Sequence, residues 1–200
     1  ADVSYYVKPE SVMDLEARER GNSTYLVDRV IPMLPEELSN GICSLVPQED
    51  RLTKCVVIDF DVKGRIVETY FCDAVICTPR KYAYEEAQEI LEDLGKGGRL
   101  GNRIREAWDL ASLLRKRRFD NGGLDLDMPE VSIVLDDKGV PTGYQREEYN
   151  ESHQLIEEFM LVANEAVARM VKNSNRPTIY RVHEDPDPDK LKEFAELARS

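Results

Sequence analysis

The apolar side chains of residues 152–173 recur at the spacing of an α-helix, and this long segment limits the possible folds more than any other. Residues three and four positions apart lie on the same side of a helix, so they form one wide apolar face. Asn175 and Pro177 mark its end. The pattern predicts a long amphipathic helix, whose apolar residues are Leu155, Ile156, Phe159, Met160, Ala163, Ala166, Val167 and Met170.

Three further segments have helical signals. Residues 84–94 and 100–118 both repeat apolar residues at helical spacing, and the glycine-rich residues between them interrupt the pattern. Near the end of the chain, Asp187 followed by Pro188 is typical of an N-cap and a first helical residue. We therefore expect two amphipathic helices in the middle of the chain and a terminal helix.

The strand signals are those of hairpins. Residues 52–62 and 65–77 alternate apolar and polar side chains on either side of Lys63-Gly64, which predicts a half-buried antiparallel pair. A second hairpin is expected around residues 136–139.

Two shorter strands are also expected, at residues 178–182 and at the strand-like VSYYV of residues 3–7. Hairpins with segregated amphipathic helices give an α+β fold class, with a mixed, largely antiparallel sheet. Because the chain opens in a strand-like segment, neighbouring strands of the domain are expected to lie outside it.

Composition restricts the function. The 200 residues are 42% hydrophobic, enough for one domain with a substantial core, and the formal net charge is −12. Affinity for nucleic acid comes mainly from Lys and Arg that neutralise phosphates. Charge alone therefore favours a role without nucleic acid, such as an acidic protein-interaction domain.

The four cysteines form no CxxC pair and only two histidines accompany them, so we predict reduced thiols and no zinc site. The sequence shows no secretory signal and no apolar run near the ~18 residues of a membrane span. These features predict a cytoplasmic protein without membrane contact.

Residues 25–45 combine aromatic, proline and Asn-Gly positions that ordinary core packing would not require. Tyr25 follows a polar Gly-Asn-Ser-Thr group and precedes a short apolar run, so we expect its ring at an exposed strand end. Pro32 and Pro35 stiffen the turn behind it.

This stretch, together with ADVSYYV at residues 1–7, closely resembles the catalytic RNB domain of the ribonuclease R and ribonuclease II family. The resemblance continues through LSNGICSLVPQEDRL at 38–52, ESHQLIEEFMLVANEAVARMV at 151–171 and IYRVHEDPDPDKL at 179–191. It covers nearly the whole chain and implies that residues 1–200 are an internal part of one such domain, which is incomplete here.

Family members are processive, hydrolytic exoribonucleases that degrade single-stranded RNA from its 3′ end. The resemblance implies two Mg²⁺ ions, held by aspartates expected upstream of the segment that matches ADVSYYV. It further implies a later segment with an arginine that helps stabilise the reacting phosphate. It also implies flanking small β-barrel domains of the OB type, which would supply positive charge for RNA. No metal ligand is assigned within this chain, and the isolated segment is predicted to be inactive.

The resemblance also implies roles for three residues. Tyr25 matches a tyrosine that stacks near the 3′-terminal nucleotides, and stacking suits RNA because every base has a π-face. Tyr84 matches a tyrosine near the end of the bound RNA, where it would help set the point at which trimming stops. Glu157 matches an acid near the terminal sugar, whose 2′-hydroxyl distinguishes RNA from DNA.

Each role has a structural alternative. Tyr25 is also compatible with a half-buried strand aromatic, and Tyr84 with helix-core packing. Glu157 and Glu158 are also compatible with a solvated helix face, the usual position of paired acids. Leu126 lies where the family generally has an aromatic residue opposite the stacking tyrosine, so it would give apolar contact without stacking.

The cationic run of residues 115–118 has two interpretations. It could contact phosphate, or form a solvated helix end that complements the helix dipole. Asp125, Asp127 and Glu130 are interpreted as surface residues.

Three functions follow. The leading hypothesis is the RNA 3′-end-binding segment of a 3′→5′ exoribonuclease that releases nucleoside 5′-monophosphates. The alternatives are a non-catalytic RNA-binding module and an acidic protein-interaction domain, and the sequence upstream would separate the first two.

Overall fold

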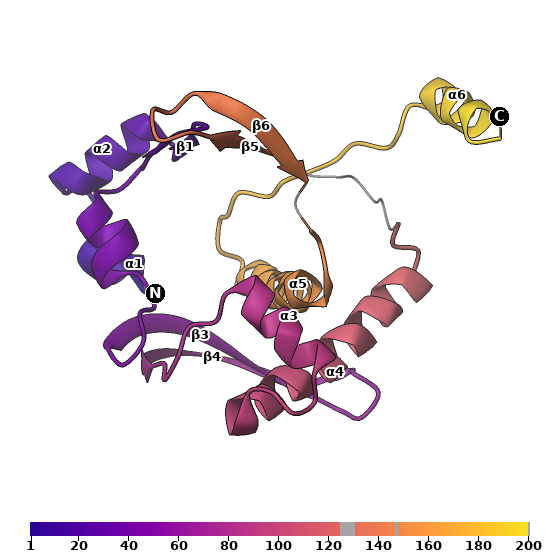
Figure 1. The fold of residues 1–200 in the computed structure, drawn as a ribbon, viewed down its shortest axis with the longest axis horizontal. Helices are drawn as coiled ribbons and strands as arrows, with labels where there is room; N and C mark the ends of the chain where they lie inside the picture. Colours follow the sequence, from indigo (N-terminus) through magenta and orange to yellow (C-terminus); the bar gives the residue numbers. More distant parts are fainter. Residues whose placement is uncertain (125–130, 147, 200) are drawn as a thin grey trace. The chain divides into compact units, whose positions relative to one another are not determined.

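The computed structural model describes residues 1–124, 131–146 and 148–199, and the chain divides into two compact parts, residues 1–166 and 167–200. Figure 1 shows the order of the helices and strands. In the first part, antiparallel strand pairs alternate with helices, which confirms the α+β fold class with largely antiparallel hairpins.

The chain begins with a helix, where the sequence suggested a strand. Helix α1, Val3–Tyr6, starts at Asp2, whose side chain accepts a hydrogen bond from the Tyr5 amide. The Asp2 amide donates to the Leu52 carbonyl at 2.7 Å. The strand prediction was wrong because this N-cap closes a helical turn that the alternation of residues 3–7 does not reveal.

Helix α2, Val12–Arg20, is capped by Ser11 and ends at Gly21. Strands β1, Thr24–Tyr25, and β2, Val30–Ile31, form a minimal antiparallel pair. The predicted position of Tyr25 in a strand is thus confirmed, and Tyr25 is 78% exposed.

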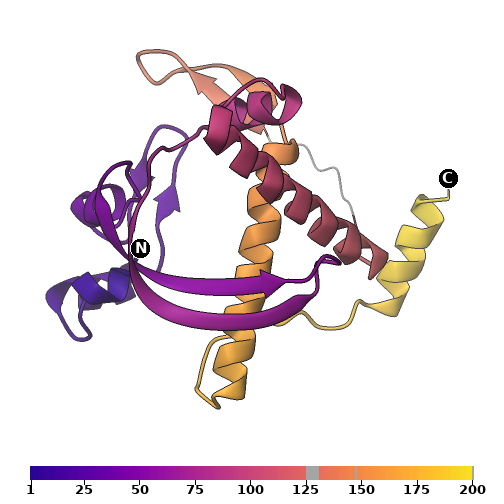
Figure 2. The ribbon, with the colours of Figure 1, turned by 90° about the horizontal axis from the view of Figure 1, so that it is seen from below.

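A short π-helix, η1, spans Glu37–Ile42. It leads into the longest strand pair, β3, Asp50–Phe60, and β4, Ile66–Cys77. Figure 2 shows this pair as a long hairpin. The predicted hairpin is confirmed, although β3 is half-buried and β4 mostly exposed.

Helices α3, Tyr84–Glu92, and α4, Gly98–Asp120, follow as predicted. The chain turns tightly between them at Gly97, where φ is +79° and a Cβ atom would lie 2.8 Å from the Gly101 Cα. A side chain at position 97 would therefore separate the start of α4 from the loop. Arg105 fixes the same loop by donating to the carbonyls of Asp93 and Lys96, at 2.9 and 2.8 Å.

The second predicted hairpin is also confirmed. Strands β5, Val131–Leu135, and β6, Pro141–Arg146, pair antiparallel around a turn in which Asp136 accepts from the Lys138 and Val140 amides.

Helix α5 spans Glu151–Asn173 and confirms the long helix expected from periodicity. The sequence placed Ile156 and Met160 on its buried face, but they are 41% and 58% exposed. Ser152 and Glu158 are buried instead, alongside Leu155. The buried side of α5 is therefore partly polar, because it contains groups that pair with other helices.

In the second part, helix α6, Pro188–Leu197, begins at Asp187, whose side chain accepts from the Asp189 amide. This cap confirms the terminal helix. The strand expected at residues 178–182 is wrong, since these residues form neither helix nor strand. Within the described ranges no strand pairs with them, and Ile179 is 99% exposed.

Across the described parts of the chain, no helix combines the length and apolar character needed to cross a membrane.

Candidate functional site

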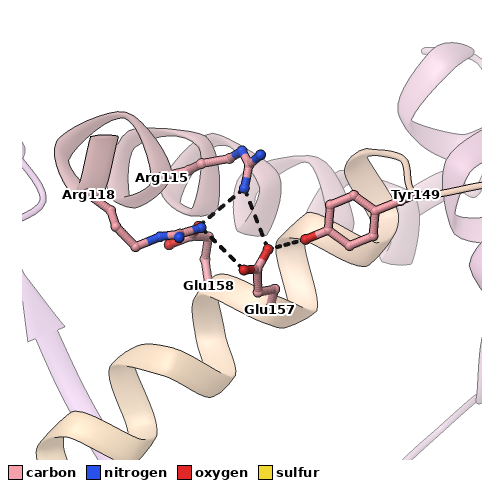
Figure 3. Close-up of polar contacts among 5 residues, drawn as sticks. All are labelled: Arg115, Arg118, Tyr149, Glu157 and Glu158. Carbon is pink, nitrogen blue, oxygen red and sulfur yellow. Dashed lines mark hydrogen bonds and ion pairs between the residues drawn. The ribbon is translucent and has the colours of Figure 1, made fainter. Parts of the chain in front are cut away.

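Two carboxylates of α5 face two guanidinium groups of α4, and Figure 3 shows these side chains pointing toward one another. Arg118 Nη2 lies 2.5 Å from Glu158 Oε1 and 3.3 Å from Glu157 Oε1. Arg115 Nη1 lies 3.5 Å from Glu157 Oε2 and 3.7 Å from Glu158 Oε1. Two positive and two negative groups therefore meet between the helices.

Glu158 is the buried member of this cluster. Its side chain is only 4% exposed, whereas that of Glu157 is 35% exposed. A solvated face is therefore the wrong interpretation for Glu158. It lies three residues after the buried Leu155, so the helical repeat turns both residues to the same side.

The cationic run does not form a uniformly solvated helix end. The side chains of Arg115 and Arg118 are 14% and 33% exposed and face the acids of α5. The hydrogen bond to Glu158 raises the pKa of the Arg118 guanidinium, and the nearby Glu157 charge adds to the effect. The carboxylates of α5 therefore stabilise the positive charge that Arg118 carries.

Tyr149, just before α5, completes the surroundings of Glu157. Its hydroxyl donates a hydrogen bond to Glu157 Oε2 (Figure 3). Desolvation of the phenol, with this hydrogen bond, raises the pKa of Tyr149 to about 12. At neutral pH the phenol therefore remains a hydrogen-bond donor.

Helix α3 meets the start of α5 through Gln88. Its Nε2 donates to Glu151 Oε2 at 2.7 Å, and its Oε1 accepts from the Ser152 amide at 3.1 Å. The amide of Ser152 is one of those at the helix start that lack an intrahelical acceptor, so Gln88 satisfies it. This contact fixes the start of α5 against α3.

Tyr84 lies one helical turn before Gln88, and its ring stacks on His153 with centroids 3.9 Å apart and planes 17° apart. His153 Nδ1 lies 2.9 Å from Asn150 Oδ1, which helps hold the imidazole. Tyr84 is 43% exposed, so packing in a helix core does not describe it.

A chain of contacts connects Tyr84 with Glu157. Tyr149 lies next to the stacked His153, with ring centroids 6.0 Å apart, and its hydroxyl contacts Glu157. The structure thus brings two of the predicted site residues, Tyr84 and Glu157, into one neighbourhood of α3 and α5.

The other two predicted residues are placed differently. Tyr25 belongs to β1, and within the described part of the chain no hydrogen bond, ion pair or ring contact joins it to Tyr84 or Glu157. Leu126 lies outside the described residues, as do Asp125, Asp127 and Glu130.

The acids of the described residues form no metal-binding cluster. Mg²⁺ is held by several oxygen ligands, usually carboxylates with water. No group of three or more His, Cys, Asp or Glu residues is arranged to hold a metal ion within residues 1–124, 131–146 and 148–199. The paired acids Glu157 and Glu158 face arginines instead.

The sequence did not single out Tyr149, nor Arg118 as a partner of the acids. One signal was available for the ion pair, because a charged residue three positions from Leu155 falls on the buried face of α5 and needs a partner. For Tyr149 no comparable signal exists, since the loop before α5 has no periodicity.

Comparisons with known proteins agree with this architecture. A model of the RNB domain family matches residues 1–200. Ribonuclease R of Thermotoga maritima is 43% identical over 195 residues, which cover 96% of this chain and 28% of that protein.

Two solved structures of Mycoplasma genitalium RNase R are 33% identical to this chain and cover 100% of it. One is in complex with ribose methylated single-stranded RNA, with a TM-score of 0.93, and the other with double-stranded RNA, with a TM-score of 0.92. This chain covers 32% and 36% of them, so it spans about a third, or less, of the length of these relatives. The family match over residues 1–200, which confirms the resemblance seen in the sequence, shows that this chain belongs to the RNB domain family.

Proposed function

We propose that this chain is the RNA 3′-end-binding part of the RNB domain of a processive, hydrolytic 3′→5′ exoribonuclease. The whole protein would degrade single-stranded RNA to nucleoside 5′-monophosphates, with all 200 residues belonging to one domain. The observation that supports this most is the position of Glu157 in a chain with an RNB match. This partly exposed acid is bound by Tyr149, whose ring lies next to the His153 that stacks on Tyr84.

Glu157 is suited to bind the terminal ribose. Arg115 and Arg118 compensate its charge, and 35% of its side chain remains exposed. An ionised carboxylate accepts hydrogen bonds on both oxygens, so hydroxyl groups of a sugar are natural donors to it. A 2′-hydroxyl bound in this way would select RNA over DNA.

The tyrosines supply contacts for the bases. Tyr84 is 43% exposed and is connected to Glu157 through His153 and Tyr149, so it would lie close to the end of the RNA and help set where trimming stops. Tyr25 is 78% exposed, and a base near the 3′ end could stack on its ring. Leu126 would add apolar contact opposite Tyr25 without stacking.

The hydrolytic chemistry is assigned to the rest of the protein. Mg²⁺, when bound, would activate water and stabilise the leaving oxygen, and the carboxylates that hold it are expected outside this chain. OB-type domains elsewhere in the protein would supply the positive charge that a chain of net charge −12 lacks.

The test uses the whole protein with a 5′-labelled single-stranded RNA and a matched RNA that ends in 2′-deoxyribose. We expect Glu157→Gln to lower kcat/KM on the RNA by about tenfold or more, the effect of losing one charged hydrogen bond. The preference for a terminal ribose should fall with it. The matched control is Glu106→Gln, which changes an exposed acid of α4 that pairs with Arg103 of the same helix.

Three results would contradict the proposal. The first is an unchanged ribose preference in Glu157→Gln. The second is RNA binding by the whole protein without shortening, which would indicate a non-catalytic RNA-binding module. The third is the absence of any RNA affinity, which would favour the acidic protein-interaction domain. Chromatography of the products should show nucleoside 5′-monophosphates.

A further inference from the structure

We propose that Arg118 and Tyr149 are positioning residues for Glu157, which fix its carboxylate so that it presents its remaining acceptor sites to the 3′-terminal ribose. This inference rests on the proposed function of Glu157. It adds two residues that the family resemblance did not indicate, and both act through Glu157.

The geometry supports fixation from two sides. Arg118 approaches Glu157 Oε1 at 3.3 Å from α4, and the Tyr149 hydroxyl binds Glu157 Oε2 from the segment before α5. A glutamate on a helix surface normally samples several rotamers. With each oxygen engaged by a donor from a different element, the carboxylate plane of Glu157 has one preferred orientation.

Arg118 is itself anchored by the buried Glu158. Its Nη2 lies 2.5 Å and its Nε 3.1 Å from Glu158 Oε1, both closer than the contact to Glu157. A guanidinium is planar and rigid, so anchoring one edge also fixes the direction of its other donors. Glu158 therefore sets the position of Arg118, and Arg118 sets the position of Glu157.

The arginines also face the negative charges of both adjacent acids. Glu157 and Glu158 are neighbours in sequence, and the side chain of Glu158 is only 4% exposed, so water screens the repulsion between the two carboxylates weakly. Arg115 and Arg118 compensate both charges, while Tyr149 provides a neutral donor.

Tyr149 leaves room for substrate because it occupies only part of the hydrogen-bond acceptor capacity of the Glu157 carboxylate. An ionised carboxylate has about four acceptor sites, and Tyr149 uses one of those on Oε2. The sites left on the exposed side of Glu157 remain for the sugar hydroxyls. The tyrosine thereby orients the acid without replacing the ligand.

The experiment measures kcat and KM of the whole protein, separately, on RNA that ends in ribose and on matched RNA that ends in 2′-deoxyribose. The variants are Tyr149→Phe, Arg118→Gln and Arg118→Lys. Tyr144→Phe, which changes a 79% exposed tyrosine of β6, and Arg103→Gln, which changes an exposed arginine of α4, are the matched controls. Unfolding midpoints show that each variant is folded.

We expect Tyr149→Phe and Arg118→Gln each to lower the ribose-to-deoxyribose ratio of kcat/KM by about tenfold, the effect of one charged hydrogen bond. Most of the loss should appear on the ribose substrate. Arg118→Lys keeps the positive charge and should recover part of the ratio, a response that a merely structural role would not produce. Both controls should retain the wild-type ratio.

The outcomes separate this inference from the proposed function. If Glu157→Gln lowers the ratio while Tyr149→Phe and folded Arg118→Gln leave it unchanged, the positioning role is overturned and the proposed function of Glu157 stands. If Glu157→Gln itself leaves the ratio unchanged, both fail. Tyr149→Phe removes one hydroxyl from a 57% exposed residue, so this variant stays informative even if Arg118→Gln does not fold.

Discussion

Arg118 of α4 binds the buried carboxylate of Glu158 on α5, with Nη2 2.5 Å from Oε1, although the two residues are 40 positions apart in the sequence. The pair joins helix α4 to helix α5. A buried acid without its partner is strongly unfavourable, so this contact holds α4 against α5 and also fixes the neighbouring Glu157.

We expect Arg118→Leu to lower the free energy of unfolding by about 3 kcal/mol, because Glu158 would remain buried without its nearest guanidinium. The value is at the low end of the usual range since Arg115 remains 3.7 Å from Glu158. Denaturant unfolding measures the change. Arg103→Leu, in an exposed pair, should cost less than about 0.5 kcal/mol.

A double variant tests the same pair. Arg118→Leu with Glu158→Leu removes both charges, and it should recover most of the stability that Arg118→Leu loses. A double variant that is less stable than either single variant would show that the ion pair does not account for the effect.

Tyr149 should titrate at unusually high pH. Its pKa is raised from 10.0 to about 12 by desolvation first and by its hydrogen bond to Glu157 second. The folded state therefore favours the protonated phenol. Its stabilising contribution is complete below pH 10.0 and is lost as the pH rises toward about 12.

The stability difference between the protein and Tyr149→Phe, about 1 kcal/mol for one hydrogen bond, should accordingly shrink over that pH interval. The ionisation of Tyr149 can be followed directly by the ultraviolet absorbance of tyrosinate, measured as the difference between the unchanged protein and Tyr149→Phe. A difference signal that is already complete near the ordinary tyrosine pKa would contradict the contact with Glu157.

Loss of the Tyr84 ring should affect both stability and product length. Tyr84→Ala removes the stack on His153, and such pairs contribute about 0.5–1.5 kcal/mol beyond the area they bury. In the whole protein we expect the final RNA product to change length, which a denaturing gel resolves. Tyr144→Ala on β6 should leave the product unchanged, and the same end product in Tyr84→Ala would argue against a place for Tyr84 at the RNA end.

The register of the long hairpin predicts a disulfide. Cys55 of β3 lies directly opposite Cys72 of β4, so their side chains point to the same face. Opposite Cβ atoms in an antiparallel pair are about 4.5–5.5 Å apart, and Cα separations there fall within the range that a disulfide spans.

A thiol oxidant of the azodicarboxamide type should therefore join Cys55 and Cys72, with loss of two hydrogen atoms that mass spectrometry of peptides detects. The oxidant accepts those two hydrogens as it is reduced. Cys72→Ala should abolish this cross-link, whereas Cys43→Ser should not. Cys77 faces Asp50 across the hairpin and provides an internal comparison. A preferred link between Cys55 and Cys77 would contradict the register.

Some of the site was visible in the sequence and some was not. Tyr84 and Glu157 were identified from a resemblance, and the structure connects them through His153 and Tyr149. The pairing of Arg118 with Glu158 was missed because helical periodicity says which side of a helix a residue occupies, and nothing about the helix that faces it. The stacking of Tyr25 on a base near the 3′ end stays a prediction.

Several elements have local signals and could be predicted before the fold was known. These are the hairpin around Lys63-Gly64, the helices α3, α4 and α5, and the capped start of α6 at Asp187. Side-chain alternation, helical spacing and caps act within a few residues, so they can be recognised without knowing the partner of each segment.

The contacts between polar groups of distant segments follow from the three-dimensional arrangement of the chain. Residues 178–182 did not form the expected strand, because a strand needs a hydrogen-bonded neighbour that those residues do not have in the described part of the chain. In the same way, Glu158 became a buried anchor because Arg118 faces it across the two helices. Pairing energies between distant residues depend on distance and burial, which no local pattern contains.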